Sequence, residues 1–531
     1  MGRATYKVRL LPSTRFGLLL LWFYGAVSMY LIRINFGVSI VCMTIDPVDN
    51  ATFDNDSLLG STVVPPDDSC EEVKQEDRQT GEFYWDRETR GILNSAFFFG
   101  YILTHIPGGI LAQKYGPKWV HFGGMTFATV ASVLCPVSAE GSEWALFACR
   151  MLIGIGCGAF VPTVRNMINN WSPVYEKSIM ASIQASGKIQ ASGKIQASGY
   201  SIGSMVAFSL SGLLCDTLGW EFTFYIPTLF VVIYLALFAP LGANGPENYS
   251  CISEKERSYI LDERSRQAQD NEMIPWRSIF TSMACICLFI CDFCTAWGSY
   301  TILTSGAQYM NDVLKFDIKA NGLYNALPPL TKFIISIIGG ILIDVIRKRH
   351  WLSTTNARKL SQTLGCVIPA AMMIGIGFMS CDNRGAAIAM MCIGEGFSGF
   401  TRIGVLTICM EVAPRYASVI SGVQSTFGTA SGILSPIVVG MLTPNGAEDE
   451  WQKVFYIGAA IYLFGWIMFI IFADAEVQDW AKGRTDHKNE TETRISKAKG
   501  DPIYSADVAT LGYKDLGMWN QELEVNVKNY I

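Results

Sequence analysis

The chain has 531 residues, of which 50% are hydrophobic and only 16% are charged, and its mean hydropathy is +0.28. A soluble chain of this length carries more charge, so the composition excludes an ordinary soluble protein. With a net charge of −5, the chain is expected to have the lipid bilayer as a partner and no nucleic acid.

The apolar residues are gathered into twelve runs, most of about 20 residues, which is the length that crosses about 30 Å of hydrocarbon as a helix. The first run is too long for the core of a signal peptide and no small-residue cleavage site follows it, so we expect it to remain as a span. The runs lie near residues 16–44, 90–113, 117–138, 143–170, 179–215, 220–241, 279–306, 321–346, 359–380, 384–411, 416–442 and 452–473.

A short motif occurs twice, at Gly108–Leu111 and at Gly339–Leu342, each time at the end of an apolar stretch and before a basic cluster. The two copies predict two related halves, the arrangement in which many transport proteins are built. We divide the chain into an N-terminus (1–15), a first bundle (16–241) with an acidic loop (45–89), a connector (242–278), a second bundle (279–473) and a disordered tail (474–531).

Basic residues gather in the connections that follow the second, sixth and eighth runs, for example Lys114, Arg257 and Arg347. Lys and Arg are retained on the cytoplasmic side, so both termini are predicted to be cytoplasmic. The segment from Ile45 to Arg90, with 13 acidic and four basic residues, then faces the lumen or the exterior. Its sequons predict glycosylation of Asn50 and Asn55.

Fifteen cysteines raise the question of a metal site or disulfides, but Cys285, Cys287, Cys291 and Cys294 lie in an apolar run without a nearby histidine. Such cysteines behave as small buried apolar residues, so we expect no metal. A hexapeptide beginning at Ile183 is repeated at 189–194 and, in part, at 195–200. We interpret this repeat as a tandem duplication or a gene-model error; the alternative is a functional insert.

Charged residues inside the spans are costly in hydrocarbon and usually face a cavity or a partner. Basic ones outnumber acidic ones five to two, so the cavity is expected to bind a small anion. The alternative is that some of these groups reach toward the membrane surface or join helices by ion pairs, an alternative that is stronger for Arg165 and Lys332. The candidates for substrate binding are Arg33, Arg150, Arg165, Lys332 and Arg402.

Coupling to a proton requires a group that changes its charge with the side of access. Glu395 and Asp292 are the acidic candidates, and His105 is a third for which a structural role is the alternative. Glu395 and Arg402 are seven residues apart, so they share a helix face at a separation of about 10 Å and need other partners. No cofactor is expected beyond a coupling ion, H⁺ or Na⁺.

Five stretches of the sequence resemble the anion:cation symporters of the major facilitator superfamily, which include sialin, the vesicular glutamate transporters and phosphate cotransporters. The resemblance covers about residues 16–480. The stretches are 33–40 (RINFGVSI), 97–109 (FFFGYILTHIPGG), 352–359 (LSTTNARK), 396–400 (GFSGF) and 413–418 (APRYAS).

This resemblance implies the major facilitator fold, an all-α membrane protein of twelve transmembrane helices in two six-helix bundles. It also implies a monomeric secondary active transporter of small organic or inorganic anions that works by alternating access as a proton or sodium symporter, in the plasma membrane or a lysosomal or vesicular membrane. Arg33 and Arg150 match the family's basic positions in helices one and four.

The same resemblance identifies a conformational latch after the second helix, with Gly109 and Lys118, and a second copy with Gly340 and Asp344. Cys157 replaces the family's acid in helix four, and Asn94 and Thr295 replace the His and Arg of the glutamate carriers. These departures argue against glutamate and against sialic acid coupled to protons in the usual way. A transporter-fold sensor that no longer transports is the alternative; an enzyme is not expected, because no nucleophile and base lie at one membrane face.

Overall fold

The computed structural model describes residues 13–45, 81–171, 191–247, 249, 252–265, 274–413 and 416–481. The predicted glycosylation sites Asn50 and Asn55 and residues 183–190 of the hexapeptide repeat lie outside this part. Residues up to Glu476 belong to one compact unit, and the short helix η5 (Asp479–Ala481) belongs to the C-terminal segment that follows it.

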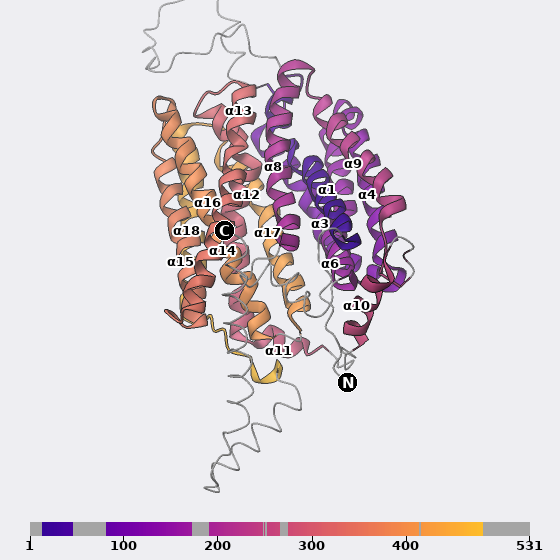
Figure 1. Cartoon of the computed structure of the whole chain (residues 1–531). Coiled ribbons are helices and arrows are strands. Elements are labelled where there is room, and N and C mark those ends of the chain that lie inside the picture. Colours follow the sequence, from indigo (N-terminus) through magenta and orange to yellow (C-terminus); the bar gives the residue numbers. More distant parts are fainter. Residues whose placement is uncertain are drawn as a thin grey trace, which may run out of the picture. The chain divides into compact units, whose positions relative to one another are not determined.

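The described part of the compact unit is almost entirely helical, with long helices side by side (Figure 1). The first half contains α1 (Thr14–Ile34), α2 (Phe36–Met43), α3 (Arg87–Tyr115), α4 (Pro117–Gly141), α5 (Glu143–Gly158), α6 (Phe160–Trp171), α8 (Ala191–Thr217) and α9 (Phe222–Leu241). The connector contributes α10 (Glu254–Ser265) and α11 (Trp276–Thr281). The second half contains α12 (Met283–Asp312), α13 (Ile318–Asn325), α14 (Leu327–Lys348), α15 (Thr354–Ile376), η3 (Cys381–Asn383), α16 (Arg384–Val412), α17 (Ala417–Leu442) and α18 (Glu448–Phe472).

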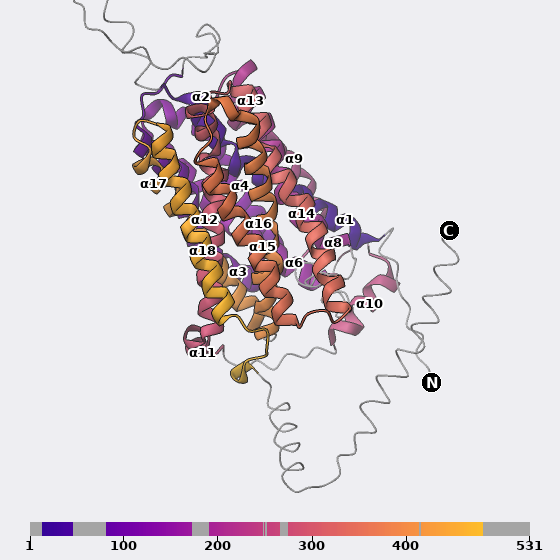
Figure 2. The same ribbon diagram turned by 90° about the vertical axis from the view of Figure 1, so that its left-hand side faces the viewer.

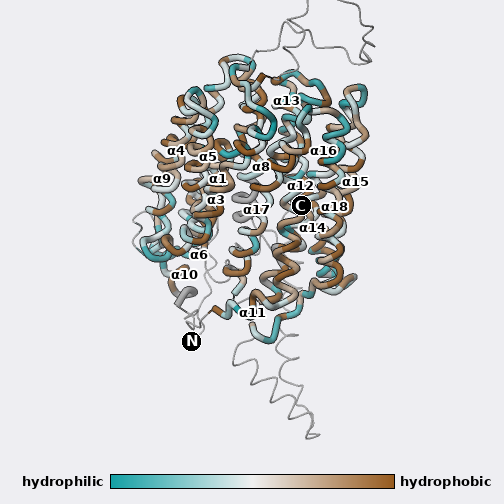
Figure 3. Tube along the Cα trace, turned by 180° about the vertical axis from the view of Figure 1, so that it is seen from behind, coloured by the Kyte–Doolittle hydropathy of each residue, from teal (hydrophilic) through white to brown (hydrophobic). Residues whose placement is uncertain are grey.

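Ten segments among the described residues are long and apolar enough to cross a membrane. α8 and α16, of 27 and 29 residues, pack beside them and complete a set of twelve. Apolar residues dominate along the helices in Figure 3, and polar residues are more frequent near their ends. The predicted all-α membrane fold is confirmed, and the chain is a multi-pass integral membrane protein.

Helix packing repeats between the halves. In the first half α3 and α4 both pack on α5, and α1 packs on α8 and α9. In the second half α14 and α15 both pack on α16, and α12 packs on α17 and α18. The halves meet where α3 contacts α17, α8 contacts α13 and α14, and α2 contacts α12. Figure 1 shows α12 and α17 near the middle of the bundle, and Figure 2 shows the same helices after a turn of 90°.

Three of the spans are interrupted by a single residue, which the hydropathy pattern did not predict. α1 and α2 are separated by Asn35, α5 and α6 by Ala159, and α13 and α14 by Ala326. Asn35 donates from Nδ2 to the carbonyl of Thr223 at 2.8 Å, and Ala326 precedes two prolines that lack the amide needed to continue a helix. Such breaks place helix ends inside the membrane, where they can contribute to a binding site.

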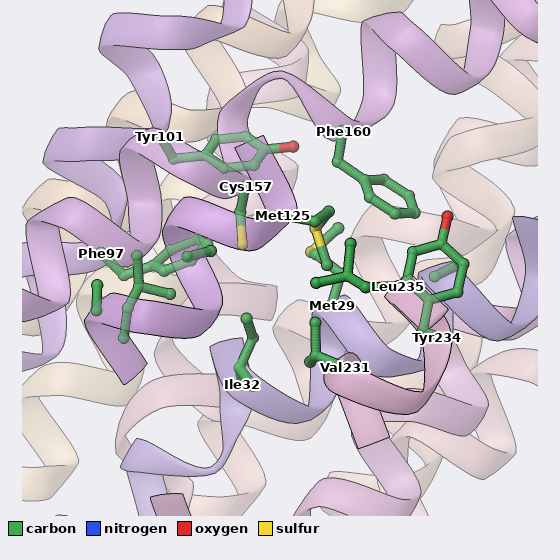
Figure 4. Packing of buried hydrophobic residues seen from close by; sticks show 14 of the residues in the cluster. Met29, Ile32, Phe97, Tyr101, Met125, Cys157, Phe160, Val231, Tyr234 and Leu235 are labelled. Atoms are coloured by element: carbon green, nitrogen blue, oxygen red, sulfur yellow. The ribbon is translucent and has the colours of Figure 1, made fainter. Parts of the chain in front are cut away.

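The core of the first half is formed by apolar side chains from all six of its spans. Figure 4 shows Met29 and Ile32 of α1 near Val231 and Leu235 of α9, with Cys157 at the end of α5 close by. All but Leu235, which is 9% exposed, have almost no contact with solvent. This packing fixes α1 and α5, the helices that carry Arg33 and Arg150.

The connector is attached to the first half by a buried ion pair. Arg15 at the start of α1 donates from Nε to Glu256 Oε1 of α10 at 2.8 Å, and both side chains are almost fully buried. The backbone amides of Thr14 and Arg15 also donate to this carboxylate, at 3.4 and 3.3 Å. Glu256 thus satisfies free amides at a helix N-terminus, where negative charge is favourable.

Candidate functional site

A small cleft lies between the two halves, at the interruption of the first span. Its cavity volume is about 10 Å³, room for about one water molecule. The lining residues come from α1 and α2, α3, α5 and α12: Arg33, Ile34, Gly37, Asn94, Phe98, Arg150, Leu303 and Thr304. A Cβ on Gly37 would lie 3.3 Å from the carbonyl oxygen of Thr304, so the missing side chain lets α2 approach α12 here.

Arg33 is the buried cation at the centre of this cleft, with 6% of its surface exposed. Its Nη2 donates to the hydroxyl of Tyr300, in the opposite half, at 3.0 Å. Five aromatic rings, from Tyr30, Phe97, Phe98, Tyr101 and Tyr300, have their centroids 5.1 to 5.6 Å from its Cζ. Ring faces stabilise a cation by cation–π attraction, but they do not neutralise its charge.

Arg150 is buried beside it, with 2% of its surface exposed. Its two terminal nitrogens donate to the backbone carbonyls of Ile32 and Arg33, both at 3.4 Å, and its Cζ lies 4.3 Å from the centroid of the Phe36 ring. These carbonyls belong to the last turn of α1, where the helix dipole favours positive charge. The interruption of the first span therefore helps to hold the second guanidinium.

Neither guanidinium has a carboxylate partner among the described residues. The Nε of Arg33 and the Nε of Arg150 are buried without a hydrogen-bond acceptor, and so is the side-chain amide nitrogen of Asn94 in the same cleft. Buried charges and donors without partners are costly, and an anion in the cleft would satisfy them. Two guanidinium groups and an amide donor are chemically complementary to the oxygens of a small carboxylate or phosphate.

The other predicted substrate-binding residues lie elsewhere. Arg165 is half-buried and donates to the hydroxyl of Ser421 of α17 at 3.1 Å. Lys332 is paired with Glu395 at 2.6 Å, and Arg402 is exposed. The structure brings together Arg33 and Arg150 and places these three residues outside the cleft lining.

The candidates for ion coupling occupy three different surroundings. Glu395 is the partner of Lys332, and Asp292 accepts a hydrogen bond from the amide of Gln424 at 3.3 Å. His105 is buried, with its ring centroid 5.4 Å from that of Tyr101, and its Nδ1 has no hydrogen-bond partner. Among the described residues, Glu395 is the one of these three groups that forms an ion pair with a basic side chain.

The predicted latch residues lie near the helix ends that the basic loops place at the cytoplasm. The Lys118 amide donates to Asn244 Oδ1 of the connector at 2.8 Å. Gly109 packs near Pro162, whereas Gly340 has open space beside it. Asp344 is 7% exposed, and its Oδ2 has no hydrogen-bond partner.

Sequence reasoning missed several residues around the cleft. Thr304, Phe98 and Tyr300 were not singled out, and Asn94 was noted only as a departure from the family pattern. Tyr300 and Thr304 are four residues apart and therefore share one face of α12, which is the signal that could have identified them.

Twelve membrane helices in two similarly packed halves, with a polar cleft between them, define a membrane transporter rather than an enzyme. The family model of the Major Facilitator Superfamily matches residues 23–436. The chain belongs to this superfamily, and within it to the family of sialin and the vesicular glutamate transporters, as the sequence motifs predicted.

Two relatives illustrate the similarity. The chain is 32% identical to human sialin over 470 residues, which cover 88% of this chain and 91% of sialin. It is 34% identical to the vesicular glutamate transporter 3 of Danio rerio over 456 residues, or 85% of this chain and 71% of that protein.

Solved structures share the fold at low sequence identity. A bacterial homologue of the human lysosomal transporter Spinster, in an inward-facing and occupied conformation, gives a TM-score of 0.62 at 13% identity and covers 86% of this chain and 96% of its own. A D-xylose-proton symporter gives a TM-score of 0.61 at 11% identity, covering 88% and 100% of the two chains. These structures support the twelve-helix fold.

Proposed function

We propose that this protein is a secondary active transporter that carries a small organic or inorganic anion by alternating access, coupled to a proton or a sodium gradient. The observation that carries the proposal is the pair of buried guanidinium groups, Arg33 and Arg150, without a carboxylate partner in the described part of the chain. An anion is the natural complement of this site, because Arg presents a planar fork to carboxylate or phosphate oxygens.

The position of the site supports alternating access. The cleft is lined from both halves, by α1, α2, α3 and α5 on one side and by α12 on the other. A rocking motion of the halves about such a site exposes it to one side of the membrane at a time. The name of the vesicular glutamate transporters points to a carboxylate as one class of anion to test.

The test is uptake of labelled anions by the purified protein in proteoliposomes. Phosphate, glutamate, sialic acid, urate and glucuronate are offered with an inward proton gradient, a sodium gradient or neither. Saturable uptake of at least one anion, driven by one of the gradients, is the expected result. Protein that is folded and binds an anion but shows no flux under any gradient would overturn the proposal in favour of a non-transporting sensor.

A further inference from the structure

The second half contains a compact group of three polar side chains from three helices. Lys332 Nζ of α14 lies 2.6 Å from Glu395 Oε1 of α16 and donates to Ser299 Oγ of α12 at 3.0 Å. Ser299 in turn donates to Glu395 Oε2 at 3.3 Å. The Lys332 and Glu395 side chains are 17% and 10% exposed, so the group is largely shielded from solvent.

The oxygens around the ammonium are those that a hard monovalent cation uses. Both carboxylate oxygens of Glu395 and the hydroxyl of Ser299 converge on one region, and Tyr462 of α18 lies beside Ser299 and Glu395. Carboxylate and hydroxyl oxygens are preferred by hard cations, and transporters bind their coupling ions with such groups between helices. The Lys332 nitrogen occupies the place where the ion would lie.

We propose that Lys332 is a built-in cation that fills a monovalent-cation site formed by Glu395 and Ser299, and that transport by this protein therefore needs no sodium. The ammonium is a compact point charge on a flexible stem, so it can take the place of a small ion. Because Lys332 is covalently attached, its local concentration at the site far exceeds that of a free ion.

Sodium and the ammonium cannot occupy this group together. One carboxylate neutralises one positive charge, and a second cation would leave an uncompensated charge in a poorly solvated region. Asp292 does not supply the missing charge, because it lies seven residues from Ser299 on α12, or about 10 Å along the helix. Its carboxylate accepts from Gln424 at 3.3 Å instead.

The group is linked to the anion cleft through consecutive residues of α12. Ser299 contacts the Lys332–Glu395 pair, and Tyr300 accepts the hydrogen bond of Arg33. A change in the occupancy of the cation site therefore shifts the helix that also positions a wall of the cleft. Because of this link, the rate of anion uptake can report whether the cation site is occupied. The inference therefore rests on the proposed function wherever uptake is the measurement.

The test compares Lys332→Met with the double variant Lys332→Met/Glu395→Gln. Methionine removes the ammonium but keeps the Glu395 carboxyl, whereas the double variant removes the carboxyl as well. Uptake by the unmodified protein is expected to be equal in sodium and in choline. Uptake by Lys332→Met is expected to fall by about tenfold or more in choline, the loss of one charge-assisted contact, and to recover in sodium or lithium.

A second readout requires no transport. The melting temperature of purified Lys332→Met should rise with the logarithm of the sodium concentration, because sodium binds only the folded state. The double variant should show no such rise, and Lys332→Met/Ser299→Ala should need more sodium for the same rise. If the unmodified protein carries no anion, the proposed function fails, but this titration still tests the cation site.

Two results would overturn the inference. One is sodium-dependent uptake by the unmodified protein, which would mean that the ammonium does not fill the coupling-ion site. The other is a Lys332→Met protein whose melting temperature and uptake do not respond to sodium or lithium, which would reduce the pair to a structural contact between α14 and α16.

Discussion

At the scale of single residues, Arg33 and Arg150 have the same chemistry but different supports. Arg33 is held by aromatic rings and one hydroxyl from the opposite half, and Arg150 is held by carbonyls at the end of α1. Neither set of contacts removes the positive charge. Both residues therefore remain available to an anion, and α1 carries one of them while it positions the other.

Replacing either residue by alanine should abolish anion uptake without reducing the amount of protein in the membrane. A hydrogen bond to a charged group contributes about 1.5 to 3 kcal/mol, so each change is expected to weaken binding by roughly tenfold to 150-fold. Binding of the transported anion to purified Arg33→Ala and Arg150→Ala measures the effect, with quantitative blotting for abundance.

Arg165→Ala is the matched control, because Arg165 donates to Ser421 and does not line the cleft. Its effect on anion affinity should be small. Normal uptake by both Arg33→Ala and Arg150→Ala would show that the anion binds elsewhere.

The sequence identified both arginines because a charge inside an apolar run is conspicuous. It did not predict that Lys332 pairs with Glu395, since the two residues lie on different helices and are 63 positions apart. Asn94 and Thr304 were equally hidden, because uncharged polar residues are common in membrane helices. Charge is visible in a sequence, whereas the pairing of charges depends on how helices pack.

At the scale of helices, small residues decide how closely α3 and α5 approach. A Cβ on Gly100 of α3 would collide with the carbonyl of Met151, and a Cβ on Gly154 of α5 would collide with the carbonyl of Phe97. The two glycines thus face each other's helix backbone. Close contact of this kind is a main source of helix association in a membrane, where no hydrophobic driving force acts between helices.

Gly100→Ala should lower the thermal stability of the protein. Overpacking costs about 1 to 3 kcal/mol, which exceeds the gain of up to about 1 kcal/mol from replacing glycine within a helix. The melting temperature of the detergent-solubilised protein measures the difference.

Gly123→Ala on α4 provides the comparison, because a Cβ there meets nothing within 4 Å. This change should leave the melting temperature equal or slightly higher. Equal melting temperatures for Gly100→Ala and Gly123→Ala would show that the contact between α3 and α5 is not tight.

The runs of apolar residues predicted the helices well, because length and hydropathy determine which segments can span a bilayer. They did not predict the interruptions at Asn35 and Ala159. Both residues lie within apolar stretches of the sequence. The break at Asn35 is stabilised by a hydrogen bond to Thr223, a residue far away in the sequence. The break at Asn35 matters because it places the end of α1, which carries Arg33, next to Arg150.

At the scale of the whole transporter, an ion pair joins the halves at the end predicted to face the lumen or the exterior. Arg87 of α3 forms an ion pair with Asp312 of α12, and the indole nitrogen of Trp451 donates to the same carboxylate at 3.1 Å. Gly91 packs against the backbone of Pro436 at this end. Cys381, near the same end, forms a disulfide, a bond typical of an oxidising side.

Asp312→Asn should shift the protein toward a state that is open at this end, because it removes the negative charge that attracts Arg87 across the two halves. The rate at which a membrane-impermeant maleimide modifies Thr304→Cys in the cleft from that side should rise severalfold. The measurement is made in right-side-out vesicles. The protein that retains Thr304 is the control, because it reports how much maleimide reacts with the native cysteines.

Asp449→Asn tests whether the effect is specific. Asp449 pairs with Lys453 on the exposed surface of α18 at the same end, with side chains 70% and 58% exposed, and exposed pairs contribute little. When Asp449→Asn is combined with Thr304→Cys, the labelling rate should equal that of Thr304→Cys alone. An unchanged rate in Asp312→Asn would mean that the Arg87–Asp312 pair does not hold the halves together.

The uncompensated arginines also make the transporter sensitive to voltage. The empty cleft carries two positive charges, and in the proposed alternating-access cycle these charges are exposed to the membrane potential first from one side and then from the other. Each full charge corresponds to about 2.3 kcal/mol for every 100 mV. A divalent anion would cancel this term and a monovalent anion would halve it, so the voltage dependence of the empty and loaded steps reports the charge of the substrate before its chemical identity is known.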